Sequence, residues 1–325
     1  MMEGLDPAAR LPAYARRMAV PGGTLRRRWL HGWLRLTAKR MALLDADIAR
    51  LRAQILRWDE RLARPDPAVR LAPVAGAAFQ GDWLDVPQSR PQRVLLYLHG
   101  GAFMFRFPRV HTALVARLCR RIGARALMVD YRLAPESPFP AAADDCDAAY
   151  RWLVAGGFPA AGIVIGGDSA GGNLALVTLQ RIRSRGEPGP ACGVLLSPAV
   201  DFTLSSRSLV THEDSDPMFR LAGLMAMRGY YASPERYLDP GVSPLFGEFA
   251  GLPPLLFQTG GIEMLLDESA RAAARAQAAG VAVELEIWEH MAHVFQALPL
   301  PQAAAALDRL AEFIARHTGW TRPGV

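Results

Sequence analysis

Beyond residue 66, short apolar runs alternate with amphipathic stretches along the chain. The run Arg93–Leu98 is apolar at nearly every position, which is typical of a strand whose two faces are both covered. Such runs, separated by helical stretches, predict a mostly parallel, doubly wound α/β sheet. The predicted strands are 93–98, 126–130, 163–165, 192–196, 255–259 and 281–287, and the predicted helices are 110–122, 141–152, 174–179, 265–279 and 302–317.

The first 65 residues look helical and separate from the rest of the chain. Apolar residues in steps of three and four run from Met41 to Leu62, which predicts an amphipathic helix. We expect this helix to pack its apolar face onto the rest of the protein. A coiled-coil or dimer contact is one alternative, and docking on a membrane surface through the arginines at 26–28 and the tryptophans beside them is another. The stripe consists of Met41, Leu44, Ile48, Leu51, Ile55, Trp58 and Leu62.

Two breaks divide the chain. Pro65-Asp66-Pro67 ends the helical N-terminal region. From 201 to 244 the alternation of strands and helices lapses into polar, Met-rich and Tyr-rich sequence, and so long a stretch without a strand indicates an insertion into the sheet. We therefore predict a core formed by 66–200 and 245–325, with 201–244 as an inserted cap segment.

Composition narrows the class of protein. The chain has 325 residues, 51% of them hydrophobic, which is enough for one large α/β core with some elaboration or for two modest domains. Its three cysteines are scattered, so we expect neither a disulfide framework nor a zinc site, and we expect a reducing compartment. No signal peptide is evident and no stretch approaches the length of an apolar span, so we expect a cytoplasmic protein without an integral membrane segment.

The charge is distributed unevenly along the chain. The formal net charge is +6, but residues 1–70 hold 15 Lys and Arg against 7 Asp and Glu, so the remainder is slightly acidic. Of the 37 basic residues only Lys39 is a lysine, which indicates a coding bias towards arginine rather than selection for phosphate contacts. Because the excess belongs to the N-terminal region and not to a groove across the molecule, we expect no nucleic-acid binding.

The clearest sign of chemistry is Gly-Asp-Ser-Ala-Gly at 167–171, between a predicted strand and a predicted helix. This is the context that a nucleophile elbow requires. The turn leaves no room for a Cβ at Gly167 or Gly171. The Ser169 hydroxyl is thereby lifted off the sheet, above the positive end of the following helix. The alternative is an ordinary glycine-rich turn with an incidental serine.

Ester hydrolysis by a serine also needs a base and an acid that orients the base, and in α/β-hydrolases the chain order is serine, acid, histidine. His293 follows a predicted strand, on a loop that would face the serine, and His290 and His317 are the other candidates. Glu263 comes shortly after a predicted strand and is the expected acid. Asp267 is the alternative acid, although acids in the first turn of a helix are also favoured by the helix dipole.

The oxyanion that forms during acyl transfer needs backbone donors. His99-Gly100-Gly101 follows the predicted strand at 93–98, and glycines let backbone amides approach a substrate oxygen closely. We therefore predict that the N–H groups of Gly100, Gly101 and Ala170 form the oxyanion hole. An ordinary tight turn is the alternative for the His-Gly-Gly sequence.

Five segments together resemble the hormone-sensitive-lipase-like family of bacterial esterases. They are Tyr97–Phe103 (YLHGGAF), Asp130–Glu136 (DYRLAPE), Gly167–Asn173 (GDSAGGN), Glu263–Asp267 (EMLLD) and His293–Phe295 (HVF). The resemblance extends from about residue 75 to the C-terminus. It implies an α/β-hydrolase fold with a mostly parallel central sheet, hydrolysis of short- to medium-chain carboxylic esters, and no cofactor.

The resemblance also bears on the parts outside the core. Family members have a helical cap built from an N-terminal segment and a mid-chain insertion, which here would be 1–65 and 201–244. Ala102 replaces the third glycine of the family's His-Gly-Gly-Gly sequence, which should leave the amides of the other two glycines usable. The expected acid is Glu263 where the family form is Asp-Pro-Leu, and this departure keeps Asp267 open.

Candidate substrate contacts are Phe103, beside the oxyanion motif, and the cap residues Met218, Phe219 and Met225. Methionine adapts to varied apolar shapes, although ordinary cap packing is the alternative for these side chains. An acidic stretch of the inserted segment resembles a metal site only superficially, because it reads as a solvent-like loop without histidines at ligand spacing. We therefore expect no metal. The acids in this stretch are Glu213, Asp214 and Asp216.

These features together predict a serine carboxylesterase that acts on a small-molecule ester through an acyl-enzyme. A lactone hydrolase of the monoterpene-lactone type, or an amidase, would use the same residues, so the sequence does not separate these activities. A non-catalytic ligand-binding protein on this scaffold is disfavoured, because receptors that resemble the family lack the histidine base and His293 is present. A homodimer is the expected assembly if the N-terminal helix serves association.

Overall fold

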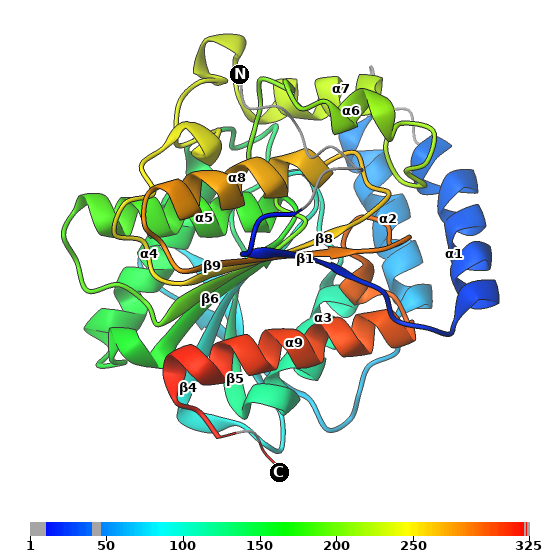
Figure 1. Ribbon diagram of the computed structural model, residues 1–325. Helices are drawn as coiled ribbons and strands as arrows, with labels where there is room; N and C mark the ends of the chain where they lie inside the picture. Colours follow the sequence, from blue (N-terminus) through cyan, green and yellow to red (C-terminus); the bar gives the residue numbers. More distant parts are fainter. Residues whose placement is uncertain (1–10, 41–46, 322, 324–325) are drawn as a thin grey trace.

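A computed structural model of the chain describes residues 11–40, 47–321 and 323. Across these residues, the centre of the molecule is a nine-stranded sheet in the order β1-β9-β8-β7-β6-β4-β5-β3-β2 (Figure 1). Neighbouring strands are parallel except at β2–β3 and β3–β5. The strands are β1 (Ala15–Met18), β2 (Arg70–Ala75), β3 (Gln80–Asp85), β4 (Arg90–Leu98), β5 (Ala124–Val129), β6 (Ile163–Asp168), β7 (Cys192–Leu196), β8 (Leu255–Gly260) and β9 (Val283–Trp288).

Helices cover both faces of the sheet. Val94, Leu96 and Leu98 of β4 belong to the core on one face, while Leu95 and Tyr97 belong to the core on the other. Because both faces are buried over 94–98, this part of the strand is apolar at every position and shows no alternation. All three cysteines are buried as free thiols in these two cores. The first face is covered by α4 (Ala141–Ala155), α5 (Ala170–Ser184) and α8 (Leu266–Ala278), and the second by α3 (Pro108–Ile122) and α9 (Pro301–Thr318) (Figure 1).

This architecture confirms the predicted mostly parallel α/β fold. The predicted strand 192–196 coincides with β7, and the other predicted strands and helices overlap the observed ones. The pattern of apolar runs misses two strands, β2 and β3, which form an antiparallel hairpin at one edge of the sheet. Most of β2 faces solvent, and its Leu71 is 51% exposed. Its short apolar run is interrupted by Pro73, which argues against a strand in the sequence.

The expectation that residues 1–65 are helical and separate from the sheet is wrong at β1. This strand pairs in parallel with β9, with Ala15 opposite Leu285 and Met18 opposite Trp288. It lies at the edge of the sheet, where a strand pairs with one neighbouring strand only and is not fully covered by helices. A short edge strand with two arginines in four residues has no apolar pattern, and this is why it cannot be recognised in the sequence.

Helix α2 (Ile48–Leu62) contains most of the predicted amphipathic stripe. The first two residues of the stripe, Met41 and Leu44, lie outside the described residues. Ile55 is 2% exposed and belongs to the main core, which confirms the expected packing onto the body of the protein. Leu62, at the end of the helix, is 53% exposed, so the stripe is not buried along its whole length.

Helix α1 (Thr24–Leu36) and the residues after it contact the inserted segment. Nη2 of Arg35 donates to the carbonyl oxygen of Ser215 at 2.8 Å, and Nζ of Lys39 donates to that of Asp216 at 2.7 Å. None of the described helices is both long enough and apolar enough to cross a lipid bilayer. In Figure 1, α1 and α2 lie at one side of the molecule, close to the helices of the inserted segment, which are α6 (Ser208–Thr211) and α7 (Leu221–Tyr231).

Candidate active site

The predicted nucleophile lies on a sharp turn between β6 and α5. Ser169 has φ 54° and ψ −118°, a conformation that L-residues rarely adopt. The glycines on either side are sterically required: a Cβ on Gly167 would lie 2.3 Å from the carbonyl oxygen of Gly171, and a Cβ on Gly171 would lie 1.9 Å from that of Leu98. The turn leaves the side chain of Ser169 half-buried, on the wall of a large cavity.

His293 and Glu263 lie together on the loops after two neighbouring strands, β9 and β8. Nδ1 of His293 is 3.6 Å from Oε1 of Glu263, and both side chains are almost fully buried. The second carboxylate oxygen, Oε2, accepts hydrogen bonds from Ser197 Oγ at 2.8 Å and from the Gly260 N–H at 2.9 Å. Within the described residues neither ring nitrogen of His293 has a hydrogen-bond partner. The geometry can therefore orient the ring through Nδ1 and leave Nε2 for a proton transfer.

The other candidates for acid and base are placed elsewhere. Oδ2 of Asp267 accepts the N–H of Ser208 at 2.8 Å, so this carboxylate anchors the inserted segment. His290 is exposed to solvent. His317 lies in α9, with its ring 4.5 Å from that of Phe313, on the second face of the sheet. The structure thus brings together His293 and the first-choice acid, not these alternatives.

Ser197 is a residue of this site that the sequence reasoning missed. It directly follows β7 and has φ 47°. Its hydroxyl donates to Glu263 and accepts the N–H of Val294 at 3.2 Å. One hydroxyl therefore connects the loop that carries Glu263 to the loop that carries His293. The one signal that could have found it is its place at the end of the strand between β6 and β8, where parallel strands direct their following residues to one edge.

The prediction that the Gly100 amide is an oxyanion donor is wrong in this structure. Its N–H donates to Oδ1 of Asp168 at 3.0 Å and is therefore occupied. The same contact explains why this position is glycine, since a Cβ there would lie 2.2 Å from Oδ2 of the same carboxylate. Gly101 and Ala170 line the cavity together with Ser169, and their N–H groups are the remaining candidate donors.

Asp168 is the centre of a buried polar cluster behind the elbow. Its Oδ1 also accepts the hydroxyl of Tyr97 at 2.7 Å, and its Oδ2 lies 3.3 Å from Nε2 of His111. Burial raises the pKa of this carboxyl. His111 and the hydrogen bonds from Tyr97 and Gly100 lower the pKa by more than burial raises it, so the pKa lies below its ordinary value. A charged carboxylate thus ties the elbow to the loop after β4.

A side chain of the N-terminal region braces the same loop from outside. Nε of Arg52, in α2, donates to the carbonyl oxygen of Met104 at 2.8 Å, and Nη2 donates to that of Ala134 at 2.6 Å. Nη1 pairs with Glu136 at 2.7 Å. The predicted oxyanion loop and the Asp130–Glu136 motif are therefore held together by one arginine from outside the core.

A cavity of about 1180 Å³ opens above the elbow. Phe103, Met218 and Phe219 line it, and the ring of Phe219 stands edge-on to that of His293 with 4.8 Å between centroids. The prediction that Met225 contacts substrate is wrong, because this side chain is 50% exposed and does not line the cavity. Helix α7 directs other residues inward and this one towards solvent.

The acidic stretch of the inserted segment is not the solvent-like loop that the sequence indicates. Asp216 is fully buried, and burial raises its pKa. Its Oδ1 accepts the N–H groups of Met218 and Phe219 at 2.6 and 3.1 Å, and its Oδ2 accepts that of Met264 at 2.8 Å. This carboxylate joins the inserted segment to the residue after Glu263. No group of three or more metal-ligating side chains occurs among residues 11–40, 47–321 and 323.

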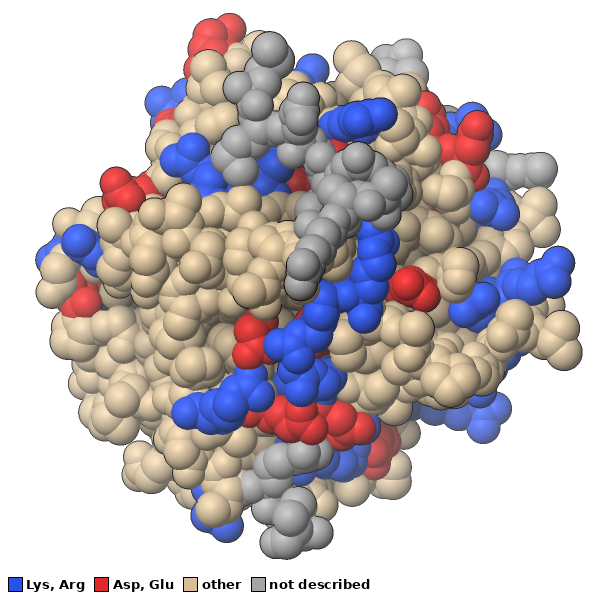
Figure 2. All heavy atoms as spheres, in the orientation of Figure 1, with Lys and Arg blue, Asp and Glu red and all other residues tan. Residues whose placement is uncertain are grey.

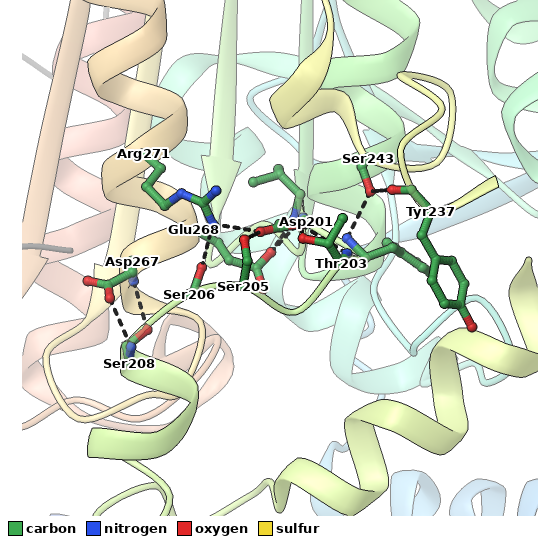
Figure 3. Close-up of polar contacts among 12 residues, drawn as sticks. Asp201, Thr203, Ser205, Ser206, Ser208, Tyr237, Ser243, Asp267, Glu268 and Arg271 are labelled. Atoms are coloured by element: carbon green, nitrogen blue, oxygen red, sulfur yellow. Dashed lines mark hydrogen bonds and ion pairs between the residues drawn. The ribbon is translucent and has the colours of Figure 1, made fainter. Parts of the chain in front are cut away.

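A second buried network fixes the start of the inserted segment to α8 (Figure 3). Oε2 of Glu268 accepts the N–H groups of Val200 and Asp201 at 2.5 and 2.9 Å, and Oδ2 of Asp201 pairs with Nη1 of Arg271 at 2.6 Å. Burial, followed by the neighbouring Asp201, raises the pKa of Glu268 well above its ordinary value. These contacts give the adjoining wall of the cavity a fixed backbone.

Comparison with known proteins agrees with this fold. A family profile described as alpha/beta hydrolase fold matches residues 95–297. A curated protein named "Esterase" from Acinetobacter venetianus is 36% identical over 78% of this chain and 84% of its own length. An "Acetyl-hydrolase" from Streptomyces hygroscopicus is 37% identical over 72% of this chain and 79% of its own length.

A solved structure extends the likeness to most of the chain. It is described as an esterase from the bacterial hormone-sensitive lipase family, and it is 36% identical, with a TM-score of 0.85, over 92% of this chain and 100% of its own. The likeness therefore includes the N-terminal and inserted segments as well as the sheet. On its fold and on these matches, the chain belongs to the hormone-sensitive-lipase-like esterases of the α/β-hydrolase family.

Proposed function

We propose that this ester hydrolase cleaves short- to medium-chain carboxylic esters through an acyl-enzyme on Ser169. The observation that carries the proposal is the pairing of His293 with Glu263 at 3.6 Å, on the cavity where the strained Ser169 lies. A buried carboxylate behind an imidazole is what a serine nucleophile needs for activation.

In the first half-reaction, Ser169 Oγ attacks the ester carbonyl carbon and its proton passes to Nε2 of His293. Glu263 keeps the proton of the neutral ring on Nδ1 and stabilises the imidazolium that forms. Collapse of the tetrahedral intermediate breaks the bond to the alcohol oxygen, which takes the proton from Nε2 as it leaves. The 3.6 Å separation suits an unliganded site, because such hydrogen bonds often tighten when substrate binds.

In the second half-reaction, water attacks the acyl carbon and gives a proton to Nε2 of His293. The carboxylic acid then leaves as Ser169 Oγ takes that proton back, which restores the enzyme. We assign the N–H groups of Gly101 and Ala170 to the oxyanion in both half-reactions, and each such donor contributes on the order of 10²–10³ in rate. The amide of Gly100 supports this hole indirectly, through its bond to Asp168.

An aromatic wall supports the assignment of chain length. Phe103 stacks on Tyr231 with 3.7 Å between ring centroids, and Phe202 stands edge-on to Phe103 at 5.7 Å. Phe103 and Phe202 both line the cavity near the elbow. We propose that this wall limits the acyl chain to short and medium lengths, while the wider part of the cavity accepts the alcohol. We also assign α1, α2 and 201–244 to a cap over the site.

Hydrolysis of p-nitrophenyl esters from acetate to palmitate, with Ser169→Ala as the matched variant, tests the proposal. We expect a loss in kcat/KM of roughly 10³-fold or more in the variant, and the highest values for acyl chains shorter than about eight carbons. Unchanged turnover in Ser169→Ala would refute the mechanism. If the wild type hydrolysed none of these esters, lactones and amides would be tested next as substrates, and then ligand binding without catalysis.

A further inference from the structure

Helix α1 carries apolar side chains on two opposite faces. Leu30 and Leu34 are buried against the body of the protein. Leu25, Trp29 and Leu36 are 82%, 68% and 61% exposed. At about 100° per residue these three lie within an arc of about 40°, opposite the buried pair. A surface helix normally carries polar residues on that face, so packing among residues 11–40 and 47–321 does not account for this exposed apolar stripe.

Arginines flank the exposed stripe. The helix contains four arginines and no acidic residue. Arg26 and Arg28 project on either side of the stripe, are exposed, and have no carboxylate partner within the described part of the chain. Figure 2 shows several separate Lys and Arg patches on the side of the molecule where α1 lies. The stripe is therefore apolar along its middle and cationic along its margins.

The end of α2 extends this surface towards the cavity. Leu62 is 53% exposed, and the neighbouring Arg61 and Arg64 are exposed as well. Trp29 lines the same cavity as these three residues, on the same side. At Trp29 and Arg26 the apolar stripe and its arginines therefore reach the cavity that holds Ser169. We call the whole surface the docking face, and its residues are Leu25, Arg26, Arg28, Trp29, Leu36, Arg61, Leu62 and Arg64.

We propose that the docking face binds an anionic lipid bilayer. Leucine and tryptophan side chains enter the boundary between headgroups and acyl chains, and the arginines contact lipid phosphates. A second copy of this chain is a poor occupant, because a symmetric contact would place the arginine clusters of the two copies against each other. An anionic bilayer supplies both the apolar layer and the opposite charge.

Docking in this way would turn one opening of the cavity towards the lipid. An amphiphilic ester could then pass from the bilayer to Ser169 without crossing water. This inference goes beyond ester hydrolysis and does not depend on it, because vesicle binding is measured without turnover. A failure of the docking proposal is therefore distinguishable from a failure of the proposed reaction.

The test is flotation of the full-length protein with vesicles of phosphatidylcholine alone or with about 30% phosphatidylglycerol. We expect the wild type to float with the anionic vesicles only, and to be released by high salt. Leu25→Ser/Leu36→Ser should lower the partition coefficient at least about tenfold. Arg28→Glu should lower it as well. The matched control is Leu71→Ser/Leu238→Ser, which changes two leucines that are 51% and 66% exposed outside the docking face and should bind like the wild type.

Hydrolysis of p-nitrophenyl butyrate in solution reports whether each variant is folded, because none of these positions lines the cavity. Absence of wild-type binding to anionic vesicles overturns the proposal. Undiminished binding of Leu25→Ser/Leu36→Ser overturns it too. A dimer in sedimentation velocity that this variant dissociates, together with no vesicle binding, would assign the docking face to a second copy and would also overturn it.

Discussion

The carboxylate of Asp168 accepts the backbone N–H of Gly100 at 3.0 Å, directly behind the strained Ser169. The residue before the predicted nucleophile and the first glycine of the predicted oxyanion loop are thus one hydrogen-bonded unit. Sixty-eight residues separate them in sequence. The relative position of elbow and oxyanion loop therefore depends on this buried charge.

Removal of that charge should cost more stability than removal of one of its donors. Asp168→Ala leaves the Tyr97 hydroxyl and the Gly100 N–H buried without an acceptor, at about 1–3 kcal/mol for each. We expect the free energy of unfolding in urea to fall by about 3 kcal/mol or more, with a large loss of kcat. Tyr97→Phe removes one donor only and should cost about 1 kcal/mol with kcat nearly retained. Equal losses in the two variants would contradict the cluster's role.

Ser197 should act on the chemical step without touching substrate. Its hydroxyl holds Oε2 of Glu263 and the N–H of Val294. In Ser197→Ala both loops lose this connection, and we expect kcat for p-nitrophenyl butyrate to fall about tenfold with little change in KM. Ser184→Ala, on an exposed helix end, is the control. A change confined to KM would mean that Ser197 shapes the cavity instead.

Substitution of the two acids after β8 should have clearly different effects on kcat. Glu263→Gln keeps the size of the side chain but removes the charge that stabilises the imidazolium, so kcat should fall by roughly 10²–10⁴. Asp267→Asn weakens the anchor to Ser208, and kcat should stay within a few-fold of the wild type. Steady-state kinetics of the two variants shows which of the two carboxylates orients His293. The reverse ranking would make Asp267 the acid.

Stability of the N-terminal helix should depend on pH through His31. Burial, followed by Arg27 and Arg35, lowers the pKa of this side chain from 6.5 to about 4. In the unfolded chain His31 therefore binds a proton near pH 6.5, whereas in the folded chain it binds this proton only near pH 4. The resulting stability is complete above pH 6.5 and is lost as the pH falls towards 4.

Thermal unfolding at pH 7 and pH 5 measures this effect. The wild type should lose Tm on acidification, and His31→Gln, which cannot titrate, should lose less. The comparison removes contributions from other groups, because these are shared by both proteins. An equal fall of Tm in the two proteins would show that the proton uptake lies elsewhere.

Features of this protein that depend on local sterics or on apolar patterning could be predicted from the sequence. Gly167 is required by a contact within its own turn, with the carbonyl oxygen of Gly171, so this part of the motif could be predicted locally. Gly171 is required by Leu98 of the neighbouring strand β4. The central strands could be predicted equally well, because a strand segment buried on both faces is apolar at nearly every position. Glu263 and His293 follow from chain order combined with the ends of neighbouring parallel strands.

Features that depend on distant partners could not be predicted in this way. The Gly100 amide looks like a free donor until Asp168 is seen beside it. Asp216 looks like a solvated loop residue, yet it is buried and accepts three backbone N–H groups. Strand β1 has too few apolar residues to be recognised, and its hydrogen-bond partner is β9, far along the chain. In each case a contact that fixes the structure joins residues that are far apart in the sequence.

Acid quenching during the first turnover shows whether the acyl group passes through Ser169. Wild-type protein mixed with excess p-nitrophenyl butyrate, quenched and analysed by intact mass and peptide mapping, should carry one butyryl group on the peptide that contains Ser169. His293→Ala should acquire this group far more slowly, and Ser169→Ala should not acquire it. A butyryl group on a different residue of the wild type, or the same adduct yield in Ser169→Ala, would show that Ser169 is not the nucleophile.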